Sequence, residues 1–181
     1  MAFWNKLQKL SSNLDKPVQT QDPLYTQPLI YSWILNNQLA IGPMPRRTFQ
    51  WNQLEDVGFK TRFSCCYPLE NVFAPIPADW FSANVPLPDH RKQEALDIDR
   101  LRLALNTAEE LVINSAPVYL HCFAGQERSS LLAVGLTARI KKIDVFSALE
   151  WVRRCHPISA PSYEYLEILE NILKTDSRFL N

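Results

Sequence analysis

The sequence predicts a single α/β domain with a central, mainly parallel sheet flanked by helices, and three observations lead to this expectation. The chain has 181 residues, a length that suits one domain with a sizeable buried core. Close to half of its residues are apolar and 11% are aromatic, which is typical of folded rather than disordered proteins. Short β-branched or aromatic runs alternate with segments of helical periodicity, as in layered α/β folds.

The folded domain is expected to span residues 29–175, with a lead-in at 1–28 and a tail at 176–181. Residues 11–28 are polar and contain prolines, which is typical of an irregular segment. Before them, Phe3, Trp4, Leu7 and Leu10 have the spacing of one apolar stripe. This stripe fits a short docking helix or a frayed terminus better than a membrane anchor.

The first half of the domain is expected to contain a hairpin, a short helix and two further strands. "LIYSWIL" and "LAIG" predict strands joined by the turn "NNQ", because asparagine tolerates turn conformations. "RTFQWNQLEDVG" predicts a helix with its N-cap at Thr48 and its end at Gly58. "FKTRFSCC" and, after a proline-rich loop, "FSANVPL" predict the two further strands.

The second half is expected to be mostly helical around one buried strand. "EALDIDRLRLALNTAEELVIN" carries apolar residues at helical spacing, so a long helix is predicted over residues 94–114. "APVYLHC" is short, apolar and bounded by Pro117, as a buried strand should be. "RSSLLAVGLTARIKK" and the segments after it predict further helices.

Charge and cysteine usage exclude several classes of partner and cofactor. The 19 basic side chains balance the 19 acidic ones, so no large positive field gathers nucleic acid or anionic lipid. The four cysteines, Cys65, Cys66, Cys122 and Cys155, contain no CxxC pair, and with three histidines no zinc spacing arises. We therefore expect no metal and no cofactor.

No apolar run approaches the roughly 20 residues that span a bilayer, and the first residues lack the features of a signal peptide. We therefore expect no stable membrane insertion, a reducing environment and a cytoplasmic location. The sequence does not indicate the oligomeric state.

The segment "HCFAGQERS" contains the candidate residues for anion binding and nucleophilic attack. If "PVYLHC" is a central strand and "RSSLLAVGLTARIKK" a helix, then residues 123–127 form a loop at the carboxyl end of the strand, where α/β folds bind ligands. Backbone N–H groups and the helix start can hold a phosphate there, and Gly125 permits a tight bend. Arg128 can offer a planar fork of donors to phosphate oxygens. The same field favours the thiolate of Cys122, which makes it a nucleophile.

These residues resemble the signature of the cysteine-based protein tyrosine phosphatases, which reads His-Cys, five residues, Arg, then Ser or Thr. The wider pattern is closest to their dual-specificity branch, and the similarity extends with decreasing force from about Ile30 to Leu173. The resemblance implies the phosphatase fold and a two-step reaction through a phosphocysteine intermediate. It also implies that residues Phe123, Ala124, Gly125, Gln126, Glu127 and Arg128 bind the substrate phosphate.

The resemblance assigns further roles. The family places an acid some thirty residues upstream, and "VPLPDHRKQ" presents Asp89, 33 positions before Cys122. Asp97 and Asp99 are alternatives, although the helical pattern around them indicates solvent-facing side chains. Ser129 matches the hydroxyl that stabilises the leaving sulfur, and it also suits an N-cap. His121 is either an orienting residue for the loop or a satisfied core histidine. His156 is expected to pack structurally against the signature helix.

The substrate class follows less directly. A carboxylate at Glu127 facing a phosphate about 7 Å away would cost about 2 kcal/mol per phosphate charge at an effective dielectric of 20, so we expect Glu127 to point outward at the rim. Relatives that hydrolyse phosphoinositides tend to carry basic residues in this loop, whereas Gln126 and Glu127 stand here. The balanced charge also disfavours an RNA 5′-phosphate. A phosphoprotein, phosphorylated on tyrosine or on serine or threonine, is the remaining substrate.

Two alternatives stay open. The pocket could capture phosphorylated partners without turnover, although relatives of that kind commonly lose the cysteine, the arginine or the acid, and all three are present here. Cys65 and Cys66 fall where some relatives keep a cysteine that traps the oxidised nucleophile as a disulfide. Cysteine is also a common small core residue, so this pairing is a hypothesis.

Overall fold

The computed structural model describes residues 27–70, 74–90 and 94–176. The apolar stripe from Phe3 to Leu10 and most of the predicted lead-in lie outside these residues. Within the described part, no helix combines the length and the apolar character that crossing a membrane requires.

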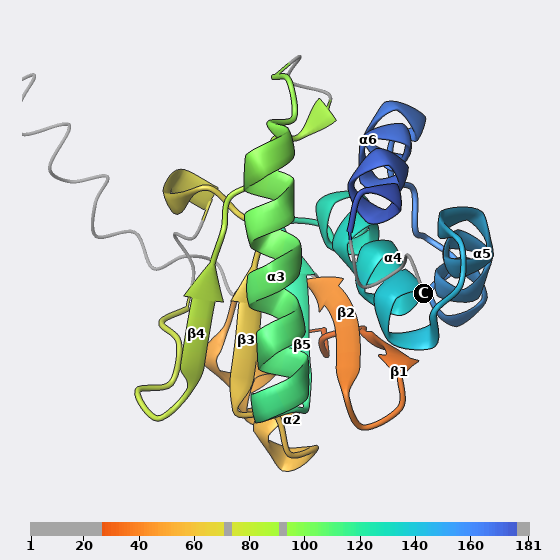
Figure 1. Cartoon of the computed structure of the whole chain (residues 1–181). Helices are drawn as coiled ribbons and strands as arrows, with labels where there is room; N and C mark the ends of the chain where they lie inside the picture. Colours follow the sequence, from red (N-terminus) through yellow and green to blue (C-terminus); the bar gives the residue numbers. More distant parts are fainter. Residues whose placement is uncertain (1–26, 71–73, 91–93, 177–181) are drawn as a thin grey trace, which may run out of the picture.

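The described residues form a sheet of five strands. These are β1 (Ser32–Leu35), β2 (Leu39–Pro43), β3 (Thr61–Ser64), β4 (Phe81–Asn84) and β5 (Val118–Cys122), in the order β1-β2-β5-β3-β4. β1 pairs antiparallel with β2, as the predicted hairpin requires, and the other neighbours are parallel (Figure 1). β5 lies at the centre and is buried along its whole length, which explains its mainly apolar sequence.

Helices cover both faces of the sheet. They are α2 (Thr48–Asp56), α3 (Ile98–Ser115), α4 (Arg128–Lys141), α5 (Val145–Cys155) and α6 (Tyr163–Lys174), with a short 3₁₀ helix at Pro68–Glu70. In Figure 1, α3 crosses the front of the sheet and α4 to α6 stand beside it, while α2 lies behind. The predicted single α/β domain with a mainly parallel sheet is confirmed.

Two apolar clusters pack against the two faces. The larger joins the α3–α6 face of the sheet to those helices and includes Leu120 and Cys122. The smaller joins α2 to the opposite face through Trp51, Leu54, Phe59 and Tyr119, among others. Side chains of successive strand residues alternate between faces, so Cys122 and its neighbour His121 project to opposite sides of the sheet.

The start of α2 differs by one residue from the prediction. The helix begins at Thr48, but Arg47 is the N-cap rather than Thr48. The side chain of Gln50 explains the shift, because its Oε1 accepts hydrogen bonds from the backbone N–H groups of Arg46 (2.7 Å) and Arg47 (3.3 Å). At the other end Gly58 has φ +100°, the left-handed conformation that glycine favours after a helix.

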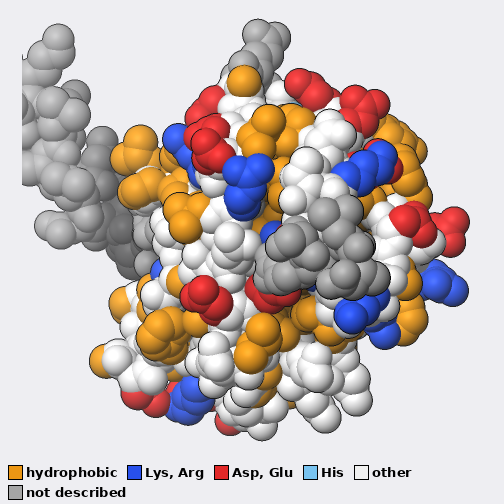
Figure 2. Space-filling view, in the orientation of Figure 1, with side chains coloured by type: hydrophobic (Ala, Val, Ile, Leu, Met, Phe, Trp, Pro, Cys, Tyr) orange, Lys and Arg blue, Asp and Glu red, His pale blue; other side chains and the backbone are white. Residues whose placement is uncertain are grey.

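Asp176, the first residue of the predicted tail, contacts the domain. Its Oδ2 lies 3.0 Å from Nη2 of Arg139 on α4, which Glu109 of α3 also contacts. On the face seen in Figure 2, acidic and basic side chains are interspersed, in keeping with the balanced net charge.

Candidate active site

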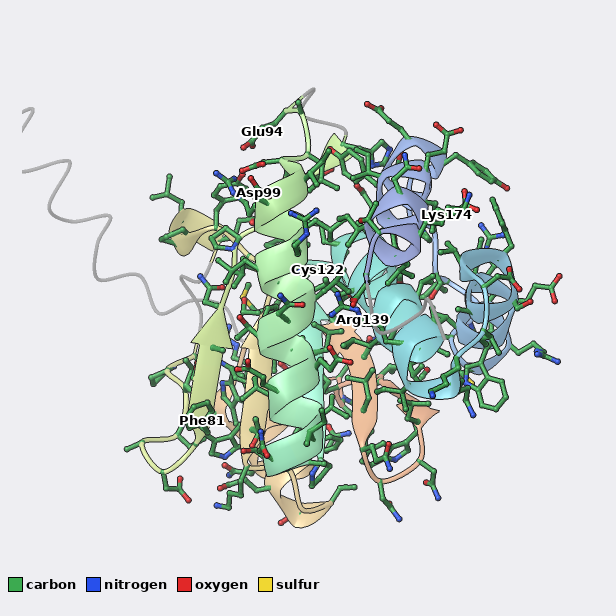
Figure 3. The ribbon with its side chains drawn as sticks, in the orientation of Figure 1. Phe81, Glu94, Asp99, Cys122, Arg139 and Lys174 are labelled. Atoms are coloured by element: carbon green, nitrogen blue, oxygen red, sulfur yellow. The ribbon has the colours of Figure 1, made fainter. Side chains whose placement is uncertain are left out.

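The 123–127 loop connects the central strand to the most buried helix. Cys122 ends β5 and Arg128 begins α4, so the loop lies at the carboxyl edge of the parallel strands; Figure 3 labels Cys122 there. Gly125 has φ +74°, and a Cβ on it would lie 2.6 Å from the backbone carbon of Gly42. The loop therefore bends tightly against the end of β2, and a side chain at residue 125 would obstruct this packing.

Two donors point at the sulfur of Cys122. The backbone N–H of Gly125 lies 3.2 Å from Sγ, and the hydroxyl of Ser129, in the first turn of α4, lies 3.3 Å from it. Donors aimed at a sulfur stabilise its anionic form more than its neutral form. Cys122 is only 2% exposed, so it is reached through the pocket above it.

That pocket has a volume of about 90 Å³ and brings together most of the residues predicted to be catalytic or to bind the phosphate. Cys122 and Arg128 line it with Asp89 from the segment after β4, and the remaining lining residues are His90, Ala124, Gln126, Glu127 and Ala160. Phe123 does not line it. The carbonyl of Phe123 instead accepts a hydrogen bond from the N–H of Met44 (3.3 Å), and its ring lies under the guanidinium of Arg46.

Arg128 is oriented by Glu70, a residue that the sequence did not indicate. Its Nη1 and Nη2 donate to the two carboxylate oxygens of Glu70 at 2.7 and 2.9 Å, and Nη1 also lies 3.4 Å from the carbonyls of Cys65 and Leu87. Burial alone would lower the pKa of Arg128, but Glu70 and Cys122 raise it. Nε of Arg128 bonds to no described residue. The edge formed by Nε and Nη2 can therefore bind a phosphate while Glu70 contacts the edge formed by Nη1 and Nη2.

The prediction for Glu127 was wrong about its surroundings. Its side chain is 10% exposed instead of projecting into solvent: one oxygen accepts a hydrogen bond from the backbone N–H of His90 at 3.0 Å, and the other lies 2.5 Å from Nδ1 of the same histidine. These contacts hold the carboxylate of Glu127 in the lining of the pocket. Glu127 thereby connects the 123–127 loop to the residue that follows Asp89.

A segment after α5 supports the loop from the other side. Nε2 of His156 lies 3.0 Å from the carbonyl of Gly125 and Nδ1 lies 2.8 Å from the hydroxyl of Ser32. Since a carbonyl only accepts, Nε2 carries the proton and Nδ1 accepts from Ser32. The N–H of Ala160 donates to the carbonyl of Gln126 at 2.7 Å. The expected structural role of His156 agrees with these contacts.

Several solved structures share this architecture. Tk-PTP in its active form superposes with a TM-score of 0.67 at 21% identity, over 80% of this chain and 97% of that one. PTPMT1 in complex with PI(5)P gives 0.67 at 15% identity, over 78% and 92%. Human DUSP28 gives 0.66 at 17% identity, over 83% and 100%. The chain has the protein tyrosine phosphatase fold. No protein-family model and no curated protein matches the sequence.

Within this phosphatase fold, His121 lies apart from the phosphate pocket. It is fully buried on the α2 face of the sheet, stacks on Tyr119, and its Nε2 lies 3.0 Å from Nη1 of Arg62. Burial and the charge of Arg62 lower the pKa of His121 to about 3, so the ring is neutral. The side chain of His121 thus contacts Arg62, a contact that the sequence did not indicate.

Cys65 and Cys66 follow β3 and are buried, unpaired thiols. Burial, with the charge of Cys122, raises the pKa of Cys66 to about 12 and raises that of Cys65 as well. Their disulfide pairing with Cys122 stays a hypothesis. A peptide linking Cys122 to either of them after peroxide treatment would support it, and its absence would reject it.

Three of the lining residues also present candidate metal ligands. Asp89, His90 and Glu127 hold ligand atoms within 4.8 Å of one another. Glu127 and His90 already contact each other, and this accounts for their proximity, so we assign no metal to the site.

Proposed function

We propose that this chain is a phosphatase that hydrolyses phosphate monoesters through a phosphocysteine intermediate. The observation that carries the proposal is the convergence on Cys122: two donors lie at its sulfur, and Arg128 and Asp89 line the same pocket. The phosphatase fold supports it, because the solved structures that share the fold include the PTP-2 phosphatase of Cydia pomonella.

In the first step the thiolate of Cys122 attacks phosphorus, and the bond to the leaving oxygen breaks. Asp89 donates a proton to that oxygen, so that an alcohol or phenol departs. Backbone N–H groups of the 123–127 loop and the free edge of Arg128 bind the phosphoryl oxygens as charge develops on them.

In the second step water attacks the phosphocysteine. Asp89, now a carboxylate, accepts a proton from the water, and the bond between sulfur and phosphorus breaks. The departing sulfur becomes anionic again and receives hydrogen bonds from Ser129 and Gly125, which lie 3.3 and 3.2 Å from it. Inorganic phosphate then leaves, and the protonated Asp89 is ready for the next substrate.

A phosphoprotein is the proposed substrate. PTPMT1 has been solved with PI(5)P, but residues 126 and 127 of this chain are Gln and Glu, and Glu127 lines the pocket. A carboxylate at that position disfavours a headgroup with several phosphates by electrostatic repulsion. A panel of phosphotyrosyl, phosphoseryl and phosphothreonyl peptides, assayed beside inositol phosphates, tests the substrate class.

Hydrolysis of para-nitrophenyl phosphate tests the mechanism. We expect turnover by the parent protein and none by Cys122→Ser, because a serine hydroxyl in the same place is a far weaker nucleophile than a thiolate. Cys155→Ser, a half-buried cysteine on α5, is the matched control and should keep full activity. Turnover that survives Cys122→Ser would exclude the mechanism. An inactive parent between pH 5 and 7.5 would instead favour the phosphate-binding module.

A further inference from the structure

Arg62 is a buried cation without an anionic partner among the described residues. It is the second residue of β3, it is 7% exposed, and strand alternation places it in one row with Tyr119 of β5 and Ser82 of β4. Its Nε donates to the hydroxyl of Ser82 at 2.8 Å, and its Nη1 lies 3.0 Å from Nε2 of His121. Both partners are neutral, since His121 is too buried to be protonated near pH 7.

The other buried arginines of the described chain are neutralised. Arg128 binds Glu70 through two hydrogen bonds, and Arg139 contacts both Glu109 and Asp176. A guanidinium group cannot lose its proton in a protein, and a buried charge is costly unless an opposite charge accompanies it. Two of the three buried arginines of the described residues therefore have a carboxylate partner, and Arg62 does not.

A cavity adjoins Arg62 where the missing anion would lie. It has a volume of about 110 Å³ between α2 and the sheet, and its other lining residues are Met44, Pro45, Trp51, Ala74, Pro75 and Ile76. Arg62 is the only charged side chain in this lining, and the others are apolar or aromatic. A cavity with one guanidinium group and apolar walls suits a carboxylate attached to a short hydrocarbon chain.

We infer that this cavity is a binding site for a carboxylate with an apolar flank, held by Arg62. The carboxylate supplies the negative charge that Glu70 supplies to Arg128, and the side chains of Trp51, Met44 and Ile76 pack against the hydrocarbon part. The proposed phosphate pocket differs, because backbone N–H groups of the 123–127 loop surround the anion there. In this cavity the donor for a carboxylate oxygen is Nη2 of Arg62, since Nε and Nη1 already contact Ser82 and His121.

The site is distinct from the phosphate pocket. Arg62 and His121 lie on the α2 face of the sheet, whereas Cys122 belongs to the cluster on the α3–α6 face. The two cavities share no lining residue. Binding of a carboxylate by Arg62 therefore does not depend on phosphatase activity, and its test stands whether or not that activity is found.

Titration with butyrate tests the inference. The indole N–H of Trp51, which lies 3.4 Å from the carbonyl of Ala74 beside the cavity, gives a separate signal in a ¹⁵N-correlated NMR spectrum, assigned with Trp51→Phe. We expect this signal to shift and to saturate at millimolar butyrate, and Arg62→Gln to weaken binding by about tenfold or more. Arg102→Gln, which removes an exposed charge on α3, should bind as the parent does.

Butyramide is the second control, since it has the shape of butyrate without the charge. If Arg62→Gln does not fold, the unaltered protein still decides the question, because only butyrate should shift the Trp51 signal. A short peptide with a free terminal carboxylate, compared with its amide, distinguishes a peptide ligand from a free acid. No saturable shift with any carboxylate, or an equal shift with butyramide, would overturn the inference.

Discussion

The guanidinium group of Arg128 contacts Glu70 along one edge and leaves a second edge for a phosphate. Glu70 holds the edge formed by Nη1 and Nη2, while Nε is not bonded to any described residue. We predict that Glu70→Gln lowers kcat for para-nitrophenyl phosphate by about tenfold, because a neutral amide orients the guanidinium group less firmly in the transition state. Phosphate affinity should fall less, since removing the carboxylate also removes its repulsion of the anion.

The measurement is kcat beside the inhibition constant for inorganic phosphate. Glu109→Gln, which alters the carboxylate beside the buried Arg139, is the matched control: it should lower stability and leave kcat unchanged. An unchanged kcat in Glu70→Gln would contradict the orienting role of Glu70.

Among the individual residues, the sequence predicted those of the motif but not the side chains that contact them, such as Glu70 beside Arg128 and His90 beside Glu127. Cys122 and Arg128 were found because the motif, the strand before it and the helix after it agree. Glu70 was missed because it lies near the start of the proline-rich loop after β3, whose path no periodicity describes. Glu127 was predicted to point outward because only its repulsion from a phosphate was considered, and its contact with His90 was not. The contact depends on where the segment after β4 runs, and a single sequence does not contain that information.

The side chain of Glu127 joins the 123–127 loop to the segment that carries Asp89. Glu127 accepts from the backbone of His90 and contacts its ring, so it holds the residue next to the proposed acid. We predict that His90→Ala or Glu127→Ala lowers kcat far more for phenyl phosphate than for para-nitrophenyl phosphate. A displaced Asp89 matters most when the leaving oxygen is basic and needs its proton.

The ratio of kcat for the two substrates measures this effect. A loss of general stability would lower both rates equally, whereas a displaced acid changes the ratio by about tenfold. Glu127→Gln keeps an acceptor for the His90 N–H and should restore part of the ratio. Equal losses on both substrates would show that the contact does not position Asp89.

Among the elements, the sequence predicted types better than boundaries. The strands and helices were recognised because apolar periodicity persists over each of them. The N-cap of α2 was one residue off because the side chain of Gln50, rather than the hydroxyl of Thr48, binds the free backbone N–H groups. α4 is buried over nearly its whole length, since α3, α5, α6 and the sheet surround it, and this explains its many small and apolar residues.

Across the whole molecule, two neutral histidines support the fold on either side of β5. His121 contacts Arg62 on the α2 face, and His156 joins the loop carbonyl of Gly125 to Ser32 of β1. Burial lowers the pKa of both, in the case of His121 to about 3. Because burial disfavours the protonated form of each ring, lowering the pH should reduce the free energy of unfolding before the carboxylates become protonated.

Acid favours the unfolded chain through His121. Its pKa falls from 6.5 in the unfolded chain to about 3 in the fold, so below pH 6.5 the unfolded state binds the proton that the folded state refuses. Stability therefore increases with pH from about 3 to 6.5 and is fully present above this range. Between pH 7 and pH 5, His121 should account for a loss of about 2 kcal/mol in the free energy of unfolding, and His156 adds to it.

Urea unfolding at pH 7 and pH 5 measures the loss. His121→Gln keeps an acceptor for Arg62 but cannot titrate, so the difference between the two pH values should shrink by about 2 kcal/mol in this variant. Arg102→Gln alters an exposed charge on α3 and serves as the control, with the pH difference of the parent. If His121→Gln retains the full pH difference, His121 is not the buried neutral group that the contact with Arg62 requires.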